Sequence, residues 1–418
     1  MGTEETDGGV DRISGLPDHL LHSILLRLPD TAAAARTGAL SRRWRRVWAH
    51  LPELSFRDHG VGPRYLSPAH RRVDAALAAH AGATVTLLDI HLRYWSPAVD
   101  RAAPPAFLRF ASRRVAGELR LSVRDRCFSA DIDLTPCERS RTTAIALTFH
   151  GQLLRFQRPP PTGGGEFAAL ATLRIKKANV DTGQLGDAVS SSRCPRLKEL
   201  FLKQVALRGG PGGDHVLSIR SGSLERLEID VRAANFHARL HVDAPRLRTL
   251  VNPRVFSDAD IVAPNLSEVC WYGPYHPTSH RLGEAGRRRH LQRLEIATDS
   301  PAVMLMQHYD TVHELQLTVK IWKGDQKYKQ YLEAIDKLSK CEVLVVRFAV
   351  IEHAVKPALR HLLMKCSGVK KIVVCCLASH KVPCESKSCQ CKCTGSKLRS
   401  NKTGNIALDL LEQPHGMQ

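Results

Sequence analysis

The chain has 418 residues, of which 43% are hydrophobic and 6% aromatic, a composition typical of a folded protein with a mainly aliphatic core. Its 61 Lys and Arg against 41 Asp and Glu give a formal net charge of +20, which permits acidic partners. No apolar stretch approaches the about 18 residues that a membrane span needs, and the polar N-terminus MGTEETDGGVDR does not fit a secretory signal. We therefore expect an intracellular protein, in the cytoplasm, the nucleus or both, with no membrane partner.

The basic residues do not form a long tract or a basic helix interleaved with aromatic residues. They gather in the short clusters RRWRR (42–46), HRR (70–72) and GRRRH (286–290). This distribution favours a solvated basic surface over a nucleic-acid-binding surface. Direct binding of nucleic acid or of another anionic ligand is kept as the alternative.

Residues 16–29, LPDHLLHSILLRLP, combine a dense apolar pattern with a proline near each end. We take Asp18 as the N-cap of a helix that runs to Leu28, because proline suits the first turn of a helix and a second proline ends it. The apolar side chains of this helix cover an arc of about 140°, and Leu26 lies off that arc. A short alanine-rich helix that closes near Gly38 follows.

Ser41 is a suitable N-cap for a third helix, in which Trp44, Val47, Trp48 and Leu51 form an apolar stripe. Each tryptophan offers about 150–250 Å² for burial. Three helices in so short a segment have too little interior to bury all of this apolar surface. Either the following domain or a partner protein must therefore cover the remainder.

The segment LPDHLLHSILLRLPDTAAAARTGALSRRWRRVWAHLPELSF resembles the plant F-box in its LP-D-LL-IL-LP opening, its A-RT middle and its LS-RWR-VW close. The resemblance implies that a Skp-family adaptor covers the apolar face and links the chain to a cullin scaffold. For each candidate residue the alternative is a place in the domain's own core, which we prefer for Leu25 and Val47. The adaptor-facing candidates carried over from the resemblance are Leu16, Pro17, Leu20, Ile24, Leu28, Leu40, Trp44 and Trp48.

Downstream, a pattern of the form apolar-x-x-apolar-x-apolar recurs, as in LERLEI (224–229) and LQRLEI (291–296). Successive copies start about 19 to 31 residues apart, a leucine-rich-repeat period in which each copy supplies one short strand. The predicted copies start at Val85, Ala116, Thr142, Leu170, Leu197, Leu224, Leu247, Leu266, Leu291, Val312, Cys341 and Val369. Unrelated strands of an ordinary α/β domain would explain single copies but not the whole series.

The asparagine or cysteine expected after each repeat strand is absent, and Val205, Arg232, Asp299 and Lys320 stand in such positions. We therefore expect irregular coils. Stretches such as CPRLKELFL and GSLERLEID resemble the repeats of plant F-box proteins with leucine-rich repeats. This resemblance implies that outward residues of the strands read a target protein. Candidates are Lys198 with Glu199, Glu225 with Arg226, and Gln292 with Arg293.

Six of the 12 cysteines and His380 lie between residues 375 and 393. Because Cys-x2-Cys spacing is missing, we favour a cysteine-rich loop over a structural zinc site and predict no metal and no cofactor. None of the common catalytic motifs is present either: G-x-S-x-G, HExxH, the dinucleotide fingerprint and the P-loop are all missing. The chain is therefore expected to be a non-catalytic protein.

The predicted fold is α/β, a three-helix F-box followed by an irregular leucine-rich-repeat solenoid. The resemblance implies a substrate receptor of a Skp–cullin–F-box ubiquitin ligase with an unidentified target protein. The alternative is a basic repeat protein that binds nucleic acid or an anionic ligand outside ubiquitin ligation. The expected organisation is a disordered tail at 1–10, the F-box at 11–57, a helical connection at 58–80, degenerate repeats at 81–375 and a cysteine-rich segment with a truncated cap at 376–418.

Overall fold

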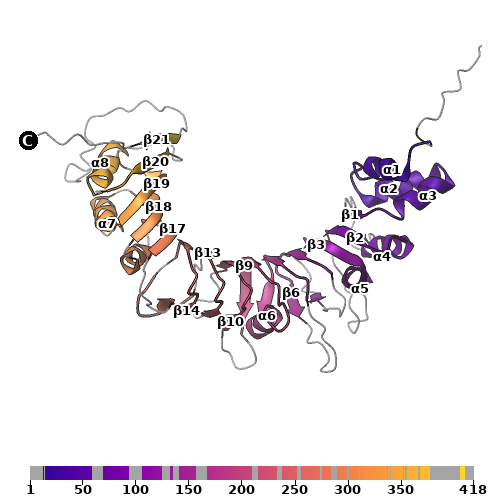
Figure 1. Ribbon diagram of the computed structural model, residues 1–418, viewed down its shortest axis with the longest axis horizontal. Coiled ribbons are helices and arrows are strands. Elements are labelled where there is room, and N and C mark those ends of the chain that lie inside the picture. The colour runs from indigo at the N-terminus through magenta and orange to yellow at the C-terminus, as the bar shows by residue number, and fades with distance from the viewer. Residues whose placement is uncertain are drawn as a thin grey trace, which may run out of the picture. The chain divides into compact units, whose positions relative to one another are not determined.

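The computed structural model shows a mixed α/β protein that divides into two compact units, residues 1–173 and 174–418 (Figure 1). It describes residues 13, 15–58, 69–93, 106–124, 132–134, 141–156, 167–209, 215–232, 238–251, 256–273, 275–283, 290–298, 301–309, 311–322, 324–336, 338, 340–351, 353, 355–365, 368–376 and 405–409. The predicted tail at 1–10, Asp299 and the cysteine-rich stretch from residue 377 to 404 lie outside these ranges.

The first unit begins with short helices at the predicted positions. They are α1 (Asp18–Leu25), α2 (Thr31–Arg36), the 3₁₀ helix η1 (Thr37–Ala39) and α3 (Arg42–Trp48). Ser41 is the N-cap of α3, as predicted, and its hydroxyl accepts a hydrogen bond from the Trp44 amide at 3.3 Å. Asp30 caps α2 in the same way.

Two details of α1 differ from the prediction. The N-cap is Pro17 rather than Asp18, and Asp18 lies in the first turn, where its carboxylate is bound by Arg43. The helix ends at Leu25 rather than at Leu28. The chain continues to Leu28 in tighter turns with 3₁₀-type hydrogen bonds, because the proline that follows disfavours α-helical geometry in the residue before it.

The rest of the first unit is built on parallel strands. In chain order they are β1 (Glu53–Arg57), β2 (Val85–Leu92), β3 (Val115–Val123) and β5 (Ala144–Thr148), each paired with the next. The short strands β4 (Ile132–Leu134) and β6 (Leu153–Phe156) also pair in parallel, and α4 (Ala69–Ala79) and α5 (Ala106–Arg114) connect β1 to β3. Leu54, Leu88, Leu119 and Ile145 stand in register and are buried.

The second unit contains a long sheet whose strands pair in parallel, in chain order. The strands are β9 (Glu199–Arg208), β11 (Arg226–Val231), β13 (Thr249–Val251), β15 (Glu268–Trp271), β17 (His290–Ala297), β18 (Thr311–Ile321), β19 (Lys340–Ile351) and β20 (Lys371–Cys376). At the end β21 (Asn405–Asp409) pairs with β20 in the antiparallel sense. β7 (Thr172–Lys176) and β8 (Asn179–Asp181) precede β9, and β8 pairs with its second half.

One apolar residue per strand forms a continuous buried row across this sheet. In register these residues are Leu200, Leu227, Leu250, Val269, Leu294, Leu315, Leu344 and Ile372, all with no exposed surface. Each predicted repeat start from Leu197 onwards lies in a strand of this sheet or within two residues before it. The arrangement is compatible with a leucine-rich-repeat solenoid.

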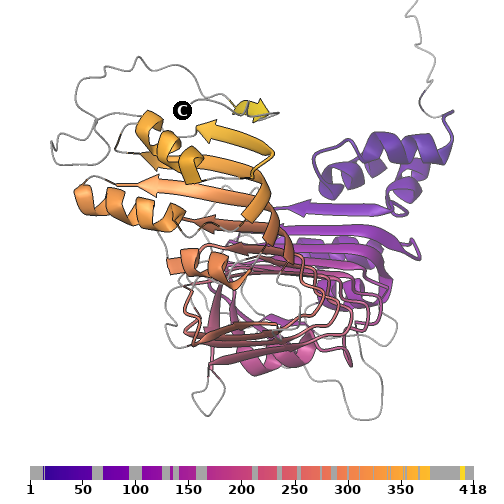
Figure 2. The ribbon, with the colours of Figure 1, turned by 60° about the vertical axis from the view of Figure 1, so that its left-hand side comes forward.

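A second parallel sheet, which the sequence analysis did not predict, completes the core of the second unit. Its strands are β10 (Val216–Arg220), β12 (Arg239–Asp243), β14 (Asp258–Val262) and β16 (His280–Leu282). Figure 2 shows it as a separate layer, and its strands carry the buried residues Leu217, Ile219, Leu240 and Val242. The remaining elements are α6 (Thr182–Ala188), η2 (Pro301–His308), α7 (Asp325–Ile335) and α8 (Val355–Lys365).

Arg232 binds two backbone carbonyls at one of the positions where the sequence lacks the expected asparagine. Its Nε donates to the Gln204 carbonyl at 2.7 Å, and its Nη2 donates to the Lys177 carbonyl at 2.8 Å. Both acceptor residues have positive φ, 52° and 56°, so the guanidinium links two strained backbone positions, one in β9 and one between β7 and β8. A long side chain thus satisfies backbone carbonyls at a position where the sequence lacks the expected asparagine.

The contact between α6 and β10 gives a prediction about two glycines of one helix. A Cβ on Gly186 would lie 2.4 Å from the Ser218 carbonyl oxygen, whereas a Cβ on Gly183 would lie no closer than 3.4 Å to the Asp181 carboxylate. Gly186→Ala should therefore lower the free energy of unfolding by about 1–3 kcal/mol. Gly183→Ala should be neutral or stabilise by up to about 1 kcal/mol, because alanine favours helix. Urea unfolding of both variants measures this, and equal effects would contradict the packing described.

Candidate functional site

The eight predicted docking residues differ in how far they reach solvent. Leu20, Ile24 and Leu40 are exposed by 42%, 41% and 71% of their surface. Pro17 is also exposed, while Leu16, Leu28 and Trp48 are half-buried. Trp44 is only 7% exposed, so the chain itself already covers its apolar surface.

Helix α1 is apolar on two sides. Leu21 and Leu25 are buried beneath it, as preferred for Leu25 in the sequence analysis. Leu20 and Ile24, one turn apart, share an outward face. Leu26 is exposed to a similar extent, 40%, but lies away from that face at the C-cap. Burial of the outward pair requires a surface that the described part of the chain does not supply.

Arg43 holds the start of α1 in place. Its Nη2 donates to the Asp18 carboxylate at 2.7 Å, its Nε donates to the same oxygen at 3.2 Å, and its Nη2 also donates to the Leu16 carbonyl. The hydrogen bonds from Arg43 lower the pKa of Asp18 below its usual value. In sequence Arg43 is one of several arginines that could be ordinary solvated charge; only the fold shows that it fixes the segment that carries Leu16 and Pro17.

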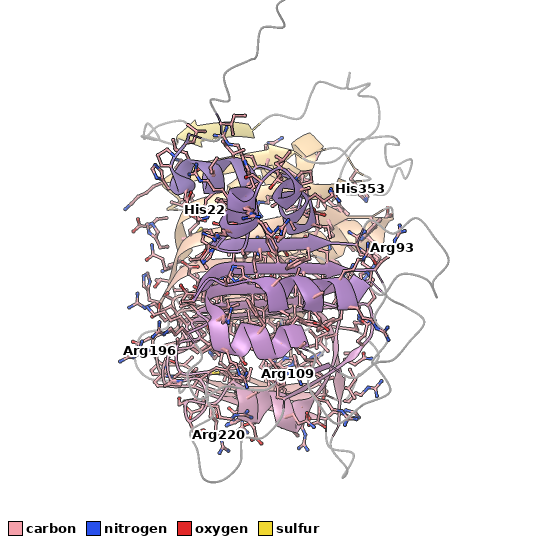
Figure 3. All side chains as sticks on the ribbon, turned by 90° about the vertical axis from the view of Figure 1, so that its right-hand side faces the viewer. His22, Arg93, Arg109, Arg196, Arg220 and His353 are labelled. Atoms are coloured by element: carbon pink, nitrogen blue, oxygen red, sulfur yellow. The ribbon has the colours of Figure 1, made fainter. Side chains whose placement is uncertain are left out.

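The core of the three helices is formed around α3. Trp44 and Val47 are buried, and Val47 also offers its carbonyl to His22 of α1, whose Nε2 donates to it at 3.1 Å. His22 is labelled in Figure 3 among these helices. Trp44 therefore belongs to the core of these helices, and of the two tryptophans Trp48 is the one that retains more exposed surface.

His80, which directly follows α4, is expected to make the stability of the first unit depend on pH. The ring is buried, and its Nε2 donates to the Leu51 carbonyl at 3.0 Å. Burial lowers its pKa below the usual 6.5, outweighing the hydrogen bond to Leu51, and nearby Arg114 adds to the decrease. The unfolded chain therefore binds this proton more readily, so stability is full above about pH 6.5 and falls as the pH drops below it.

We expect the urea concentration at the unfolding midpoint to decrease when the pH is lowered from about 7.5 to about 5.5. The decrease should be smaller in a His80→Gln variant. Unfolding curves at both pH values test this. The same slope in wild type and variant would show that His80 does not contribute. His280 is a second buried histidine with a lowered pKa, also through burial, so the variant should retain part of the slope.

Metal-ligand clusters, membrane-spanning helices and reactive thiols would each point to another kind of function. Within the described residues, no three His, Cys, Asp or Glu side chains are arranged to hold a metal ion. No helix in the same residues combines the length and hydropathy needed to cross a bilayer. Burial, followed by the nearby Glu295 carboxylate, raises the pKa of the Cys270 thiol to about 11, which makes it a poor nucleophile.

The exposed helix face and its supports lie within a segment that matches a known family model. The model, described as the F-box domain, matches residues 13–56. These residues form an F-box domain. Its boundaries enclose α1 to α3 and most of β1.

Relatives from Arabidopsis thaliana extend the similarity beyond this domain. The chain is 37% identical over 84 residues to F-box/LRR-repeat protein 25, which covers 20% of the chain and 30% of that relative. It is 27% identical over 242 residues to an FBD-associated F-box protein, covering 56% of the chain and 52% of the relative. It is 26% identical over 247 residues to an F-box/FBD/LRR-repeat protein, covering 57% of the chain and 53% of the relative.

The chain thus spans from under a third to about half of the length of these relatives. Together the matches show that the chain is similar to plant F-box/LRR-repeat and FBD-associated F-box proteins. F-box domains in general bind Skp-family adaptors, and F-box proteins in general are non-catalytic substrate receptors of Skp–cullin–F-box ubiquitin ligases.

Proposed function

We propose that the F-box of this chain docks a Skp-family adaptor through the outward face of α1 and its neighbours. The observation that carries the proposal is the exposure of Leu20 and Ile24 on a helix whose other face is fully buried. The proposed contact set is Leu16, Pro17, Leu20, Ile24, Leu28, Leu40 and Trp48, with Trp44 supporting the helices from the core. Burial of apolar surface is the main driving force for such docking.

The remainder of the chain is proposed to be a leucine-rich-repeat solenoid that holds a target protein. The row of buried leucines in register and the parallel, sequential pairing of the strands support this interpretation. Its proposed limits are residues 81–375, after the helical connection at 58–80, with the cysteine-rich segment at 376–418 as its end. The proposed place of action is the cytoplasm or the nucleus.

The proposed mechanism is proximity. The adaptor links the chain to a cullin and so to a ubiquitin-charged enzyme, while the repeats hold the target beside it. The chain forms no covalent bond and needs no cofactor in this mechanism. Tethering raises the effective concentration of target lysines near the enzyme, to about millimolar for short connections.

Co-purification with a Skp-family adaptor tests the proposal. Wild type should retain the adaptor, and a variant with Leu16→Ala and Pro17→Ala should not, because the segment held by Arg43 would lose its apolar side chains. Equal retention by both proteins would contradict the proposed interface. Failure of wild type to bind the adaptor, together with retardation of RNA or DNA at about 150 mM salt, would favour the nucleic-acid alternative.

A further inference from the structure

The outward face of the long sheet carries a half-buried aromatic ring among exposed cations near its start. We call Arg174, Phe201, Lys203 and Arg226 the Phe201 patch; they lie on β7, β9 and β11. Phe201 and Lys203 alternate along β9 with the buried Leu200 and Leu202, so they point away from the core.

The two arginines stack on the phenylalanine ring. The guanidinium carbon of Arg174 lies 4.8 Å from the ring centroid, and that of Arg226 lies 5.7 Å from it. Guanidinium groups attract the negative faces of an aromatic ring, which leaves its positive edge for other contacts. The ring edge and the two cations therefore present the same, positive, potential to solvent.

Acidic neighbours orient these cations without enclosing them. Arg174 lies 3.4 Å from the Glu199 carboxylate, and Glu228 is shared between Lys203 at 2.7 Å and Arg226 at 3.9 Å. The side chains of Arg174, Arg226 and Lys203 remain 39%, 40% and 45% exposed. Each guanidinium has five N–H donors, so a single carboxylate neighbour leaves capacity for an incoming anion.

A second charged cluster of the same sheet surrounds a buried carboxylate. Glu295 is only 7% exposed on its side chain, accepts a hydrogen bond from the Tyr272 hydroxyl at 2.6 Å and binds Arg347 at 3.1 Å. Its cationic neighbours Arg293 and Arg347 remain 36% and 38% exposed, about as much as the arginines of the Phe201 patch. The Phe201 patch adds an aromatic ring on which its two arginines stack.

We propose that the Phe201 patch docks an acidic segment of the target protein. Carboxylates of that segment pair with Arg174, Arg226 and Lys203, and an adjacent apolar side chain lies against the edge of Phe201. Charge complementarity supports this occupant, because a basic rim around an aromatic anchor is typical of strong interface positions. The inference rests on the proposed function, in which the repeats hold a target.

The test uses the full chain co-purified with its adaptor and a fluorescein-labelled peptide of about a dozen residues, rich in Asp and Glu with one central Leu. Fluorescence anisotropy at about 150 mM salt should detect binding, and a matched peptide with Asn and Gln should not bind. Arg174→Gln with Arg226→Gln should weaken binding at least about tenfold, and Phe201→Ala should weaken it severalfold.

A matched control removes the same charge elsewhere in the unit. Arg196 and Arg220, labelled in Figure 3, are exposed and lie outside the patch, so Arg196→Gln with Arg220→Gln should leave affinity within about twofold of wild type. This control is needed because the net charge of +20 attracts any polyanion.

Three results would overturn the inference: no binding of the acidic peptide, equal losses in the two double variants, or stronger, patch-dependent binding of single-stranded DNA. Adaptor retention is measured on the same samples. Loss of peptide binding with the adaptor retained contradicts only the inference, whereas absence of the adaptor from wild type contradicts the proposed function.

Discussion

Replacement of both Leu20 and Ile24 by serine is expected to weaken adaptor binding at least about 30-fold, a loss of about 2 kcal/mol. Roughly two fifths of each side chain is exposed in the free chain, and docking would bury this remainder. The hydroxyls would also be buried without assured partners, which adds to the loss. Fold stability should change little, because neither side chain belongs to the buried face of α1. Titration calorimetry with purified adaptor measures the affinity.

Leu26→Ser is the matched control for this pair. Its exposure of 40% is nearly the same, but the residue lies off the outward face, at the C-cap of α1. The control should bind the adaptor within about twofold of wild type. If Leu26→Ser weakens binding as strongly as the pair does, a general loss of apolar surface, and not this face of α1, explains the effect.

Trp44→Ala is expected to unfold the F-box, because removal of a buried aromatic side chain costs about 3–5 kcal/mol. That loss is comparable to the whole stability of a marginal domain. Trp44 is 7% exposed and lies on α3 with the buried Val47, so its loss should leave a cavity in the core of these helices. Trypsin should then cut rapidly in the arginine-rich segment 42–46, and wild type should be cut there more slowly because the segment is helical.

Trp48→Ala separates the core role from the interface role. Trp48 is half-buried, so the variant should resist trypsin longer than Trp44→Ala and should bind the adaptor more weakly than wild type. Full resistance of Trp44→Ala to trypsin would show that the ring is not needed for the core. In that case Trp44 would be better explained as an adaptor-contacting residue, as the family resemblance implies.

The sequence was sufficient to predict features in which a side chain hydrogen-bonds to backbone a few residues away. Ser41 as a cap is such a case, because the hydroxyl bonds to the amide three residues on. The buried row from Leu200 to Ile372 follows in the same way from a short apolar period. The prediction for Asp18 was wrong because its partner, Arg43, lies 25 residues further along the chain.

Features that depend on contacts between residues far apart in the chain could not be predicted from the sequence. Arg232 reaches the Lys177 carbonyl 55 residues away, and no local pattern marks an arginine as the replacement for an asparagine. The second sheet was missed for a related reason. VLSIR and RLHVD alternate as strands do, but each is short and becomes stable only against its neighbours, β10 against β12. The burial of Trp44 and the partial exposure of Trp48 likewise depend on how the helices pack.

The central claim is that the F-box presents an apolar helix face which a partner covers. Amide hydrogen exchange of the purified chain, with and without a purified Skp-family adaptor, tests it most directly. We expect slower exchange on adaptor binding in residues 16–28 and 37–48, and no change in β9 to β19. Unchanged exchange in both F-box segments with adaptor bound, or protection confined to the long sheet, would contradict it.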